Sequence, residues 1–169
     1  MRFVVLIMVA VVLCLAGCGS EPFVPVDLGA AAPKFKLDSI TAKTVITSDS
    51  LKGDIVVLNF WSTSCVNCLQ EIEELKLIHE SGRATVVGIV LDDDPQRVQS
   101  LVDKKGIKYQ VLQGDQEIFE RFDGFSIPYT LVLDRAQTVR EKFYGPMTQT
   151  QFEDVLTKIQ GSQQVAMRE

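Results

Sequence analysis

The chain has 169 residues, of which 46% are hydrophobic and 23% are charged, and its net charge is −5. This length is enough for a single domain with one hydrophobic core of ordinary size. The acidic balance offers no basic surface to a phosphate backbone, which argues against a nucleic-acid partner.

The first 17 residues have the pattern of an export signal. Arg2 supplies a positive charge, and Phe3 to Leu15 form an apolar run too short for an ordinary membrane span. The run ends in Leu15-Ala-Gly-Cys18, which resembles the bacterial lipobox, so we expect cleavage before Cys18 and lipidation of its side chain. The alternative is an ordinary cleavage site with a cysteine nearby by chance. The lipobox pattern predicts an exported domain that is anchored to a bacterial membrane through its lipid.

Residues 18–33 contain three prolines and few side chains to bury, so we expect a flexible tether there. The organised domain is predicted over residues 34–161, and residues 162–169 are expected to be a disordered tail. We expect the protein to be a monomer.

Apolar runs and helical spacings alternate along this domain. The predicted elements are, in chain order, strands at 35–37 and 44–47, a helical turn at 50–53, a strand at 55–60, a helix from the cysteine pair to 80, a strand at 85–91, a helix at 95–105, a strand at 109–112, a helix at 116–122, strands at 129–133 and 138–144, and a helix at 148–159. Such an α/β alternation implies a mixed, mainly parallel central sheet covered by helices on both faces, with an antiparallel edge and an extra N-terminal strand pair.

Two cysteines, Cys65 and Cys68, stand at the start of the helix that follows the apolar strand 55–60. Residues three apart on a helix are neighbours, and a disulfide needs its Cα atoms roughly 5.5 Å apart, so this pair can close without distorting the backbone. Unpaired amide groups at the helix start stabilise a thiolate at Cys65, which makes it the attacking nucleophile, and Cys68 is expected to be the resolving thiol. With Cys14 cleaved and Cys18 lipidated, no other thiol remains. We therefore expect thiol-disulfide exchange, with no bound metal and no cofactor besides this disulfide.

Further segments accompany the cysteine pair at a regular spacing. They are Ala32-Pro33-Lys-Phe35-Lys-Leu37, Leu51-Lys-Gly53, Val57-Leu-Asn-Phe-Trp61, Val86-Val-Gly88, Ile127-Pro128-Tyr-Thr130 and Gly145. Together they resemble the thioredoxin superfamily, and in particular the TlpA/ResA-like membrane-anchored thiol-disulfide oxidoreductases, which are related to the AhpC/TSA and Redoxin proteins. The resemblance covers residues 32–159 and implies a thioredoxin-like fold.

The resemblance also implies partners and a second half of the site. The substrates would be proteins with a disulfide or a dithiol, and a membrane electron donor would recharge an enzyme that acts as a reductant, for example on the haem-binding cysteines of apocytochrome c. Pro128 begins a predicted strand, and the resemblance implies a cis Ile127-Pro128 bond that turns the backbone of Ile127 outward as a template for an extended substrate. The motif spacing places Trp61 beside the disulfide, as a candidate substrate contact.

The chain departs from this family pattern around the cysteines. Ser64 stands where the family usually has tryptophan, and Val66-Asn67 separates the cysteines without a proline. Because neither Val66 nor Asn67 adds positive charge, we expect the helix terminus alone to activate Cys65 and the protein to be a moderate oxidant.

Proton transfer to or from Cys68 needs an acid. Cytoplasmic thioredoxins have one at the position of Asn59, so another group must serve here, and the family pattern favours Asp93 after the strand 85–91. The alternative is that Asp93 belongs to a solvated turn. Glu71 is expected to stay solvated in the first turns of the cysteine helix and to have no catalytic role.

Three other functions compete with protein disulfide exchange. Peroxide reduction is one, because peroxiredoxins share this core and Thr63 precedes Cys65, although the threonine spacing and the paired arginine of those enzymes are missing. Copper transport through Cys65, Cys68 and His79 is another, although these three make a poor tetrahedral site. The third is a structural disulfide, but a loop this small restricts the unfolded chain only a little.

Overall fold

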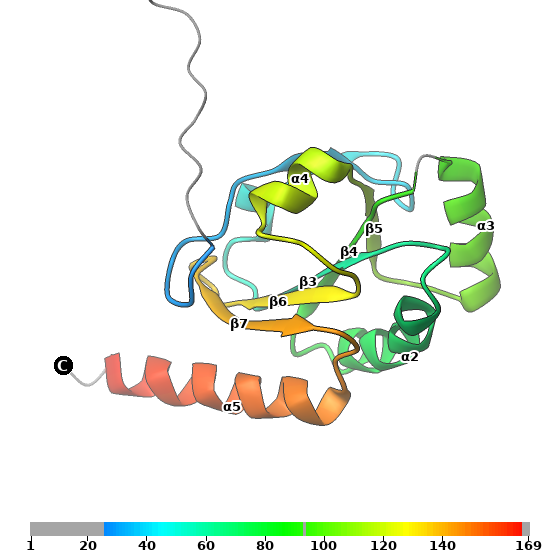
Figure 1. Ribbon diagram of the computed structural model, residues 1–169. Helices are drawn as coiled ribbons and strands as arrows, with labels where there is room; N and C mark the ends of the chain where they lie inside the picture. Colours follow the sequence, from blue (N-terminus) through cyan, green and yellow to red (C-terminus); the bar gives the residue numbers. More distant parts are fainter. Residues whose placement is uncertain (1–25, 93, 167–169) are drawn as a thin grey trace, which may run out of the picture.

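The computed structural model describes residues 26–92 and 94–166, with side chains up to residue 161 (Figure 1). The predicted export signal, the lipidation site Cys18 and the candidate acid Asp93 therefore lie outside the described residues.

A five-stranded mixed sheet forms the centre of the domain, as predicted, in the order β5-β4-β3-β6-β7 (Figure 1). The neighbours β3–β4 and β4–β5 are parallel, whereas β6 is antiparallel to β3 and to β7. Four strands therefore run in one direction and β6 runs in the other. Their bounds are β3 Val56–Trp61, β4 Thr85–Val90, β5 Gln110–Gln113, β6 Tyr129–Leu133 and β7 Val139–Tyr144.

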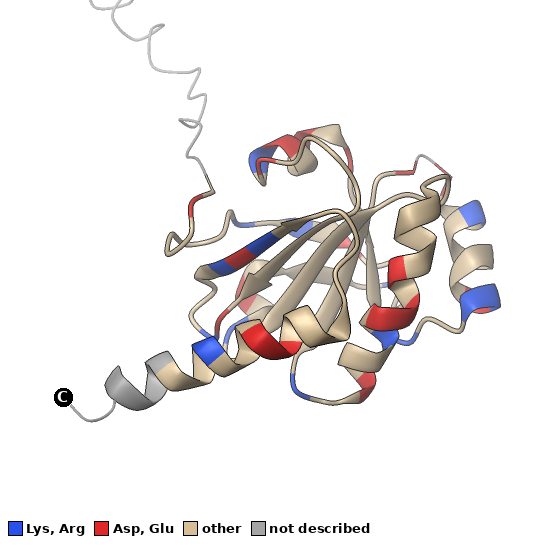
Figure 2. Cartoon of the chain, turned by 60° about the horizontal axis from the view of Figure 1, so that its bottom comes forward, with Lys and Arg blue, Asp and Glu red and all other residues tan. Residues whose placement is uncertain are grey.

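Helices cover both faces of this sheet and create two apolar cores. One face is packed by α2 (Val66–Glu80), α3 (Pro95–Lys105) and α5 (Gln149–Ala166), and the other by α4 (Gln116–Arg121) together with the N-terminal segment. Both faces of β3 are thus buried, which explains its uninterrupted apolar run. In Figure 2 the acidic and basic residues lie outside β3, β4, β5 and β6, for example on the helices, on the loops and on the edge strand β7.

The N-terminal segment contacts both edges of the sheet. Ala31 bridges to Thr138 beside β7, and Ser39 bridges to Leu112 of β5. Between these bridges the chain forms β1 (Lys36–Asp38), which pairs with β2 (Val45–Thr47), and it then enters the 3-10 helix η1 (Ser48–Leu51). Unpaired amide groups at a sheet edge can form hydrogen bonds with another chain. The bridges of the N-terminal segment cover part of each edge against such pairing.

Local signals explain where the helices begin and end. Asp94 caps α3 by accepting hydrogen bonds from the amides of Gln96 and Arg97, and Gly106 ends it in the left-handed conformation at φ 62°. The predicted bounds of α3 were therefore correct. The last helix is longer than predicted and extends to Ala166, into the segment expected to be a tail, because no proline follows Ile159 and the helix continues through Gly161.

Candidate active site

The two cysteines form a disulfide at the start of α2, directly after the central strand β3. Their Cα atoms are 5.2 Å apart. Cys65 is half-buried, whereas Cys68 is buried among the side chains of the α2 face of the core. Only Cys65 therefore presents its sulfur to an incoming protein, as the predicted roles of nucleophile and resolving thiol require.

The backbone of α2 points a hydrogen-bond donor at the outer sulfur. Cys65 is the N-cap residue, and the amide of Cys68 donates to its Sγ at 3.2 Å. This amide is one of the four at a helix start that have no partner within the helix, and it lies at the positive end of the helix dipole. When the disulfide is reduced, the same geometry stabilises a thiolate on Cys65.

The loop between β3 and Cys65 is held by a carboxylate from the neighbouring strand end. Asp92, which follows β4, accepts hydrogen bonds from the amide of Thr63 at 2.7 Å and from its Oγ1 at 2.5 Å. The side chain of Gln113 in turn donates to the carbonyl of Asp92 at 2.7 Å. The segment that carries the nucleophile is thus tied to β4 and β5.

The predicted proline element lies against the cysteines. The Ile127–Pro128 peptide bond is cis, the form that the resemblance implies. Pro128 is buried, Ile127 is half-buried, and the carbonyl oxygen of Ile127 is 3.9 Å from Sγ of Cys65. Residues more than sixty positions apart are brought together here because β6, which starts at Tyr129, pairs with β3.

Trp61 lies differently from the substrate contact expected for it. Its side chain is 1% exposed and belongs to the same core cluster as Cys68. The reason is that β3 is the central strand, so a residue at its end is covered by the helices of one face. Trp61 presents no surface to a substrate in this form and supports the cysteine helix from inside.

Glu71 is the residue that the sequence analysis missed. It was expected to be solvated, but it is 2% exposed and accepts three hydrogen bonds. The donors are the side-chain amide of Asn59 at 2.9 Å, the hydroxyl of Thr130 at 3.2 Å and the backbone amide of Met147 at 2.8 Å. Asn59 also donates to Thr130 at 2.8 Å, which closes the network.

This environment changes the acidity of Glu71. Burial raises its pKa to about 7, although the hydrogen bonds from Met147, Asn59 and Thr130 oppose that shift. Glu71 is also three residues after Cys68, so the two side chains share one face of α2. The domain therefore holds a buried acid with a pKa near neutral pH, one helical turn along α2 from Cys68. Asn59, at the strand position where an acid was looked for, is one of its hydrogen-bond donors.

A signal for Glu71 is present in the sequence. The buried residues of α2 are Cys68, Glu71, Ile72, Leu75 and Ile78. A carboxylate at position 71 therefore interrupts an apolar stripe with helical spacing, and buried carboxylates in such a stripe need partners.

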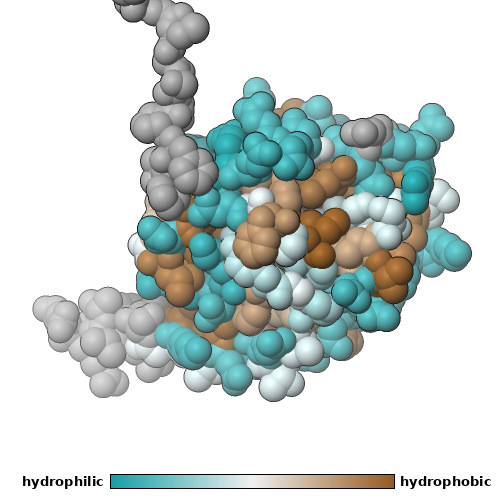
Figure 3. Space-filling view, viewed as in Figure 1, coloured by the Kyte–Doolittle hydropathy of each residue, from teal (hydrophilic) through white to brown (hydrophobic). Residues whose placement is uncertain are grey.

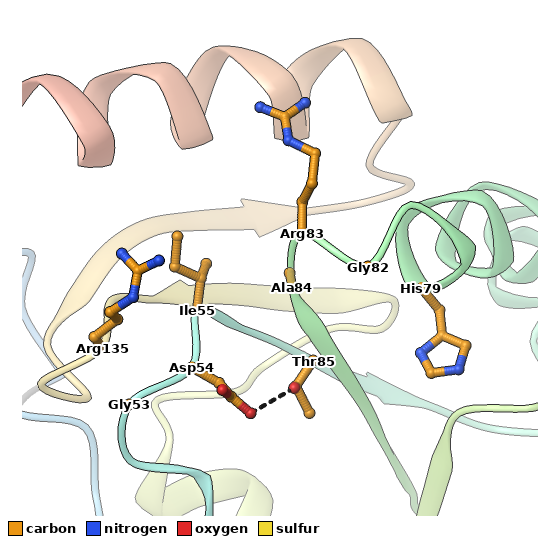
Figure 4. Close-up of a pocket in the computed structure, with 9 residues that line it drawn as sticks. All are labelled: Gly53, Asp54, Ile55, His79, Gly82, Arg83, Ala84, Thr85 and Arg135. Carbon is orange, nitrogen blue, oxygen red and sulfur yellow. Dashed lines mark hydrogen bonds between the residues drawn. The ribbon is translucent and has the colours of Figure 1, made fainter.

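A second surface feature lies away from the cysteines. A pocket of about 330 Å³ is formed around the beginnings of β3 and β4, and its lining includes Asp54, which accepts a hydrogen bond from Thr85 at 2.8 Å (Figure 4). The cysteines follow the other end of β3. His79 also borders this pocket, and it is fourteen residues along from Cys65, about 21 Å at the rise of an α-helix.

The sheet order, the cysteine pair after the central strand and the facing cis-proline define the class of thioredoxin-fold thiol-disulfide oxidoreductases. The chain belongs to the AhpC/TSA family, which it matches over residues 28–142. It is 28% identical over 137 residues to thiol-disulfide oxidoreductase ResA of Bacillus thuringiensis, and this alignment covers 79% of each protein. It is 29% identical over 133 residues to thiol:disulfide interchange protein HelX of Rhodobacter capsulatus, which covers 77% of this chain and 73% of HelX.

Solved structures show the same fold. A DsbF homologue from Corynebacterium diphtheriae superposes with a TM-score of 0.71 at 24% identity, over 84% of this chain and 96% of the homologue. The predicted fold class is therefore confirmed.

Proposed function

We propose that this enzyme reduces disulfides of exported proteins with Cys65 and Cys68. The observation that carries the proposal is the accessible sulfur of Cys65, which lies at the start of α2 and 3.9 Å from the carbonyl oxygen of Ile127, with Cys68 buried behind it. The Cys65 thiolate attacks one sulfur of the substrate disulfide, and the other sulfur leaves as a thiolate. Cys68 then attacks Sγ of Cys65, so that the substrate gains two electrons and two protons and the enzyme becomes the disulfide.

Glu71 is proposed to serve as the proton acceptor for Cys68. The resolving thiol must lose its proton inside the domain, and Glu71 is an acid buried on the same face of α2. A carboxylate with a pKa of about 7 changes its protonation in the pH range where the enzyme has to work. Asp93 is the other candidate, from the family pattern, and mutation of each acid separates the two.

The direction and the location of the reaction are proposed from the family and from the N-terminal sequence. A protein that matches this chain is named ResA, and a structural neighbour is described as a secreted thiol-disulfide isomerase from Corynebacterium glutamicum. We propose export, a lipid anchor at Cys18, a membrane electron donor and reduction of substrates such as apocytochrome c. Along the described part of the chain, no helix combines the length and the apolar character that a membrane crossing needs.

Two contacts argue against the competing functions. The hydroxyl of Thr63 is hydrogen-bonded to Asp92, so the feature that suggested peroxide reduction is explained by a structural role. His79 packs edge-on against Tyr109, 6.1 Å between ring centroids, near the far end of α2 from the cysteines. It is too far from Cys65 to complete a copper site.

A trapping experiment tests the proposed function. A Cys68→Ser variant expressed from the full gene should retain its substrates as mixed disulfides on Cys65, which are released by dithiothreitol and identified by mass spectrometry. A Cys65→Ser variant is the control, because the remaining thiol of Cys68 is buried. Equal trapping by both variants, or none by Cys68→Ser, would contradict the proposed mechanism.

A further inference from the structure

Phe125 is an exposed aromatic residue close to the active site. It is 73% exposed, the largest fraction among the exposed large hydrophobic residues of the described chain. Phe125 precedes Ile127 by two residues, which places their Cα atoms within about 7 Å of each other. Figure 3 shows apolar side chains gathered on this face, where the connection from α4 to β6 passes the start of α2.

A stack of aromatic rings holds Phe125 in place. Its ring stacks on that of Tyr144 at 4.3 Å between centroids, and Tyr144 stacks on Tyr129 at 4.6 Å. Tyr129 is buried and stacks on Phe60 of the central strand at 5.9 Å. The stack therefore runs from the core to the surface and ends in the open face of Phe125, with each contact contributing about 0.5–1.5 kcal/mol.

The loop that carries Phe125 is fixed as well. Gly124 donates its amide to the carbonyl of Phe119 at 2.9 Å, and a Cβ at position 124 would lie 2.1 Å from the Phe119 ring. The hydroxyl of Tyr129 donates to the carbonyl of Phe122 at 3.0 Å. Since the exposed ring is already ordered, a partner that contacts it loses little additional side-chain entropy on the protein side.

The surroundings of Cys65 favour a neutral, apolar partner. Val66, which follows the nucleophile, is 69% exposed, so exposed apolar side chains stand both at the start of α2 and on the loop before Ile127. Neither residues 61–68 nor residues 124–130 include a charged side chain. A polypeptide whose disulfide reaches Cys65 passes over these two uncharged segments, and an aromatic or large aliphatic side chain gains from contact with the exposed ring there.

We infer that Phe125, supported by Tyr144, determines substrate specificity by binding an aromatic or large aliphatic side chain next to the reacting cysteine of the substrate protein. The inference rests on the proposed function, because it assumes that a polypeptide disulfide reacts at Cys65. It assigns the end of the aromatic stack to the substrate and not to another copy of this chain.

The test uses two disulfide-bonded peptides that differ only beside the cysteine, one with leucine and phenylalanine and one with serine at those positions. The reduced protein, produced from the full gene, should reduce the apolar peptide with the higher second-order rate constant. Phe125→Ala should decrease this preference about fivefold, in line with the loss of one aromatic contact. Phe125→Trp should retain it.

Leu77→Ala provides the matched control, because Leu77 is exposed on α2 but lies toward the far end from the cysteines. It should keep the wild-type preference. If Phe125→Ala keeps that preference too, or if it only converts a dimer into a monomer, the inference is overturned. If the wild-type protein reduces neither peptide, the proposed function itself fails, which is a different outcome.

Discussion

Glu71 shows how a single residue can be misjudged from sequence and still be explained by it. Acidic residues in the first turns of a helix are common because they interact with the helix dipole, so a solvated role was the natural expectation. In the folded domain the carboxylate is instead buried and accepts hydrogen bonds from Asn59 and Thr130 on the sheet and from Met147 before α5. These partners come from distant parts of the chain, and no local pattern reveals them.

Burial of Glu71 makes the stability of the domain depend on pH. Because its pKa rises from 4.5 to about 7 on folding, the folded state holds the proton more tightly than the unfolded state. The free energy of unfolding should therefore fall as the pH rises from about 4.5 to 7, by about 3 kcal/mol for this group, and level off above. Chemical denaturation at several pH values should show this decline in the wild type and not in Glu71→Gln. The same decline in both proteins would contradict the assignment.

The two candidate acids can be separated by the reactivity of Cys68. In a Cys65→Ser background, removal of the negative charge by Glu71→Gln should shift the pH dependence of Cys68 alkylation down by about one unit, because a like charge disfavours the thiolate. Asp93→Asn serves as the comparison. Mass spectrometry of the alkylated protein measures the pH dependence of Cys68 alkylation in both variants. If only Asp93→Asn shifts this pH dependence, the proposed role belongs to Asp93.

Asp92 holds the loop before the nucleophile through two hydrogen bonds to Thr63. Asp92→Ala should lower the free energy of unfolding by about 1–3 kcal/mol, because it leaves the partly buried donors of Thr63 without a partner. Thr63→Val removes only the hydroxyl bond and should cost less. Urea denaturation gives both values, and faster amide hydrogen exchange at residues 63–65 in Asp92→Ala would show that the loop has loosened.

At the scale of the elements, local signals predicted what local physics controls. The predicted bounds of α3 were correct at both ends, because Asp94-Pro95 starts the helix and Gly106 ends it. The end of α5 was missed because Gly161, a residue type that often ends helices, lies inside this helix and no proline follows it. The position of Trp61 in the core was missed for another reason, since it depends on which strand is central, and strand order is a long-range property of the sheet.

Close packing between β4 and its neighbours gives a further prediction. A Cβ on Gly88 would lie 2.9 Å from Nε1 of Trp61 and 3.3 Å from the ring of Tyr109. Gly88→Ala should therefore destabilise the domain by about 1–3 kcal/mol through overpacking. Gly161→Ala in α5, where a Cβ meets nothing within 4 Å, should be neutral or stabilising by up to about 1 kcal/mol. Thermal unfolding measures the pair, and equal effects would contradict this view of the core.

At the scale of the whole molecule, the sequence predicted the fold class and the cysteine pair, because the motif combines short-range spacing with strand and helix patterns. It did not predict how the N-terminal segment bridges β7 and β5, because those contacts join Ala31 to Thr138 and Ser39 to Leu112. The carboxyl end of β3 and the beginning of β6 meet in the active site for the same topological reason. The chemistry of Cys65 thus depends on contacts that only the folded sheet provides.

The central claim is that Cys65 and Cys68 exchange their disulfide reversibly with other thiols. A redox titration of the full-length protein in dithiothreitol or glutathione buffers, read by alkylation and mass spectrometry, tests it directly. We predict one two-electron transition carried by these two cysteines, at a potential more negative than about −120 mV, the value of a strongly oxidising disulfide donor. A disulfide that exchanges with neither couple, or a midpoint near that value, would contradict the account.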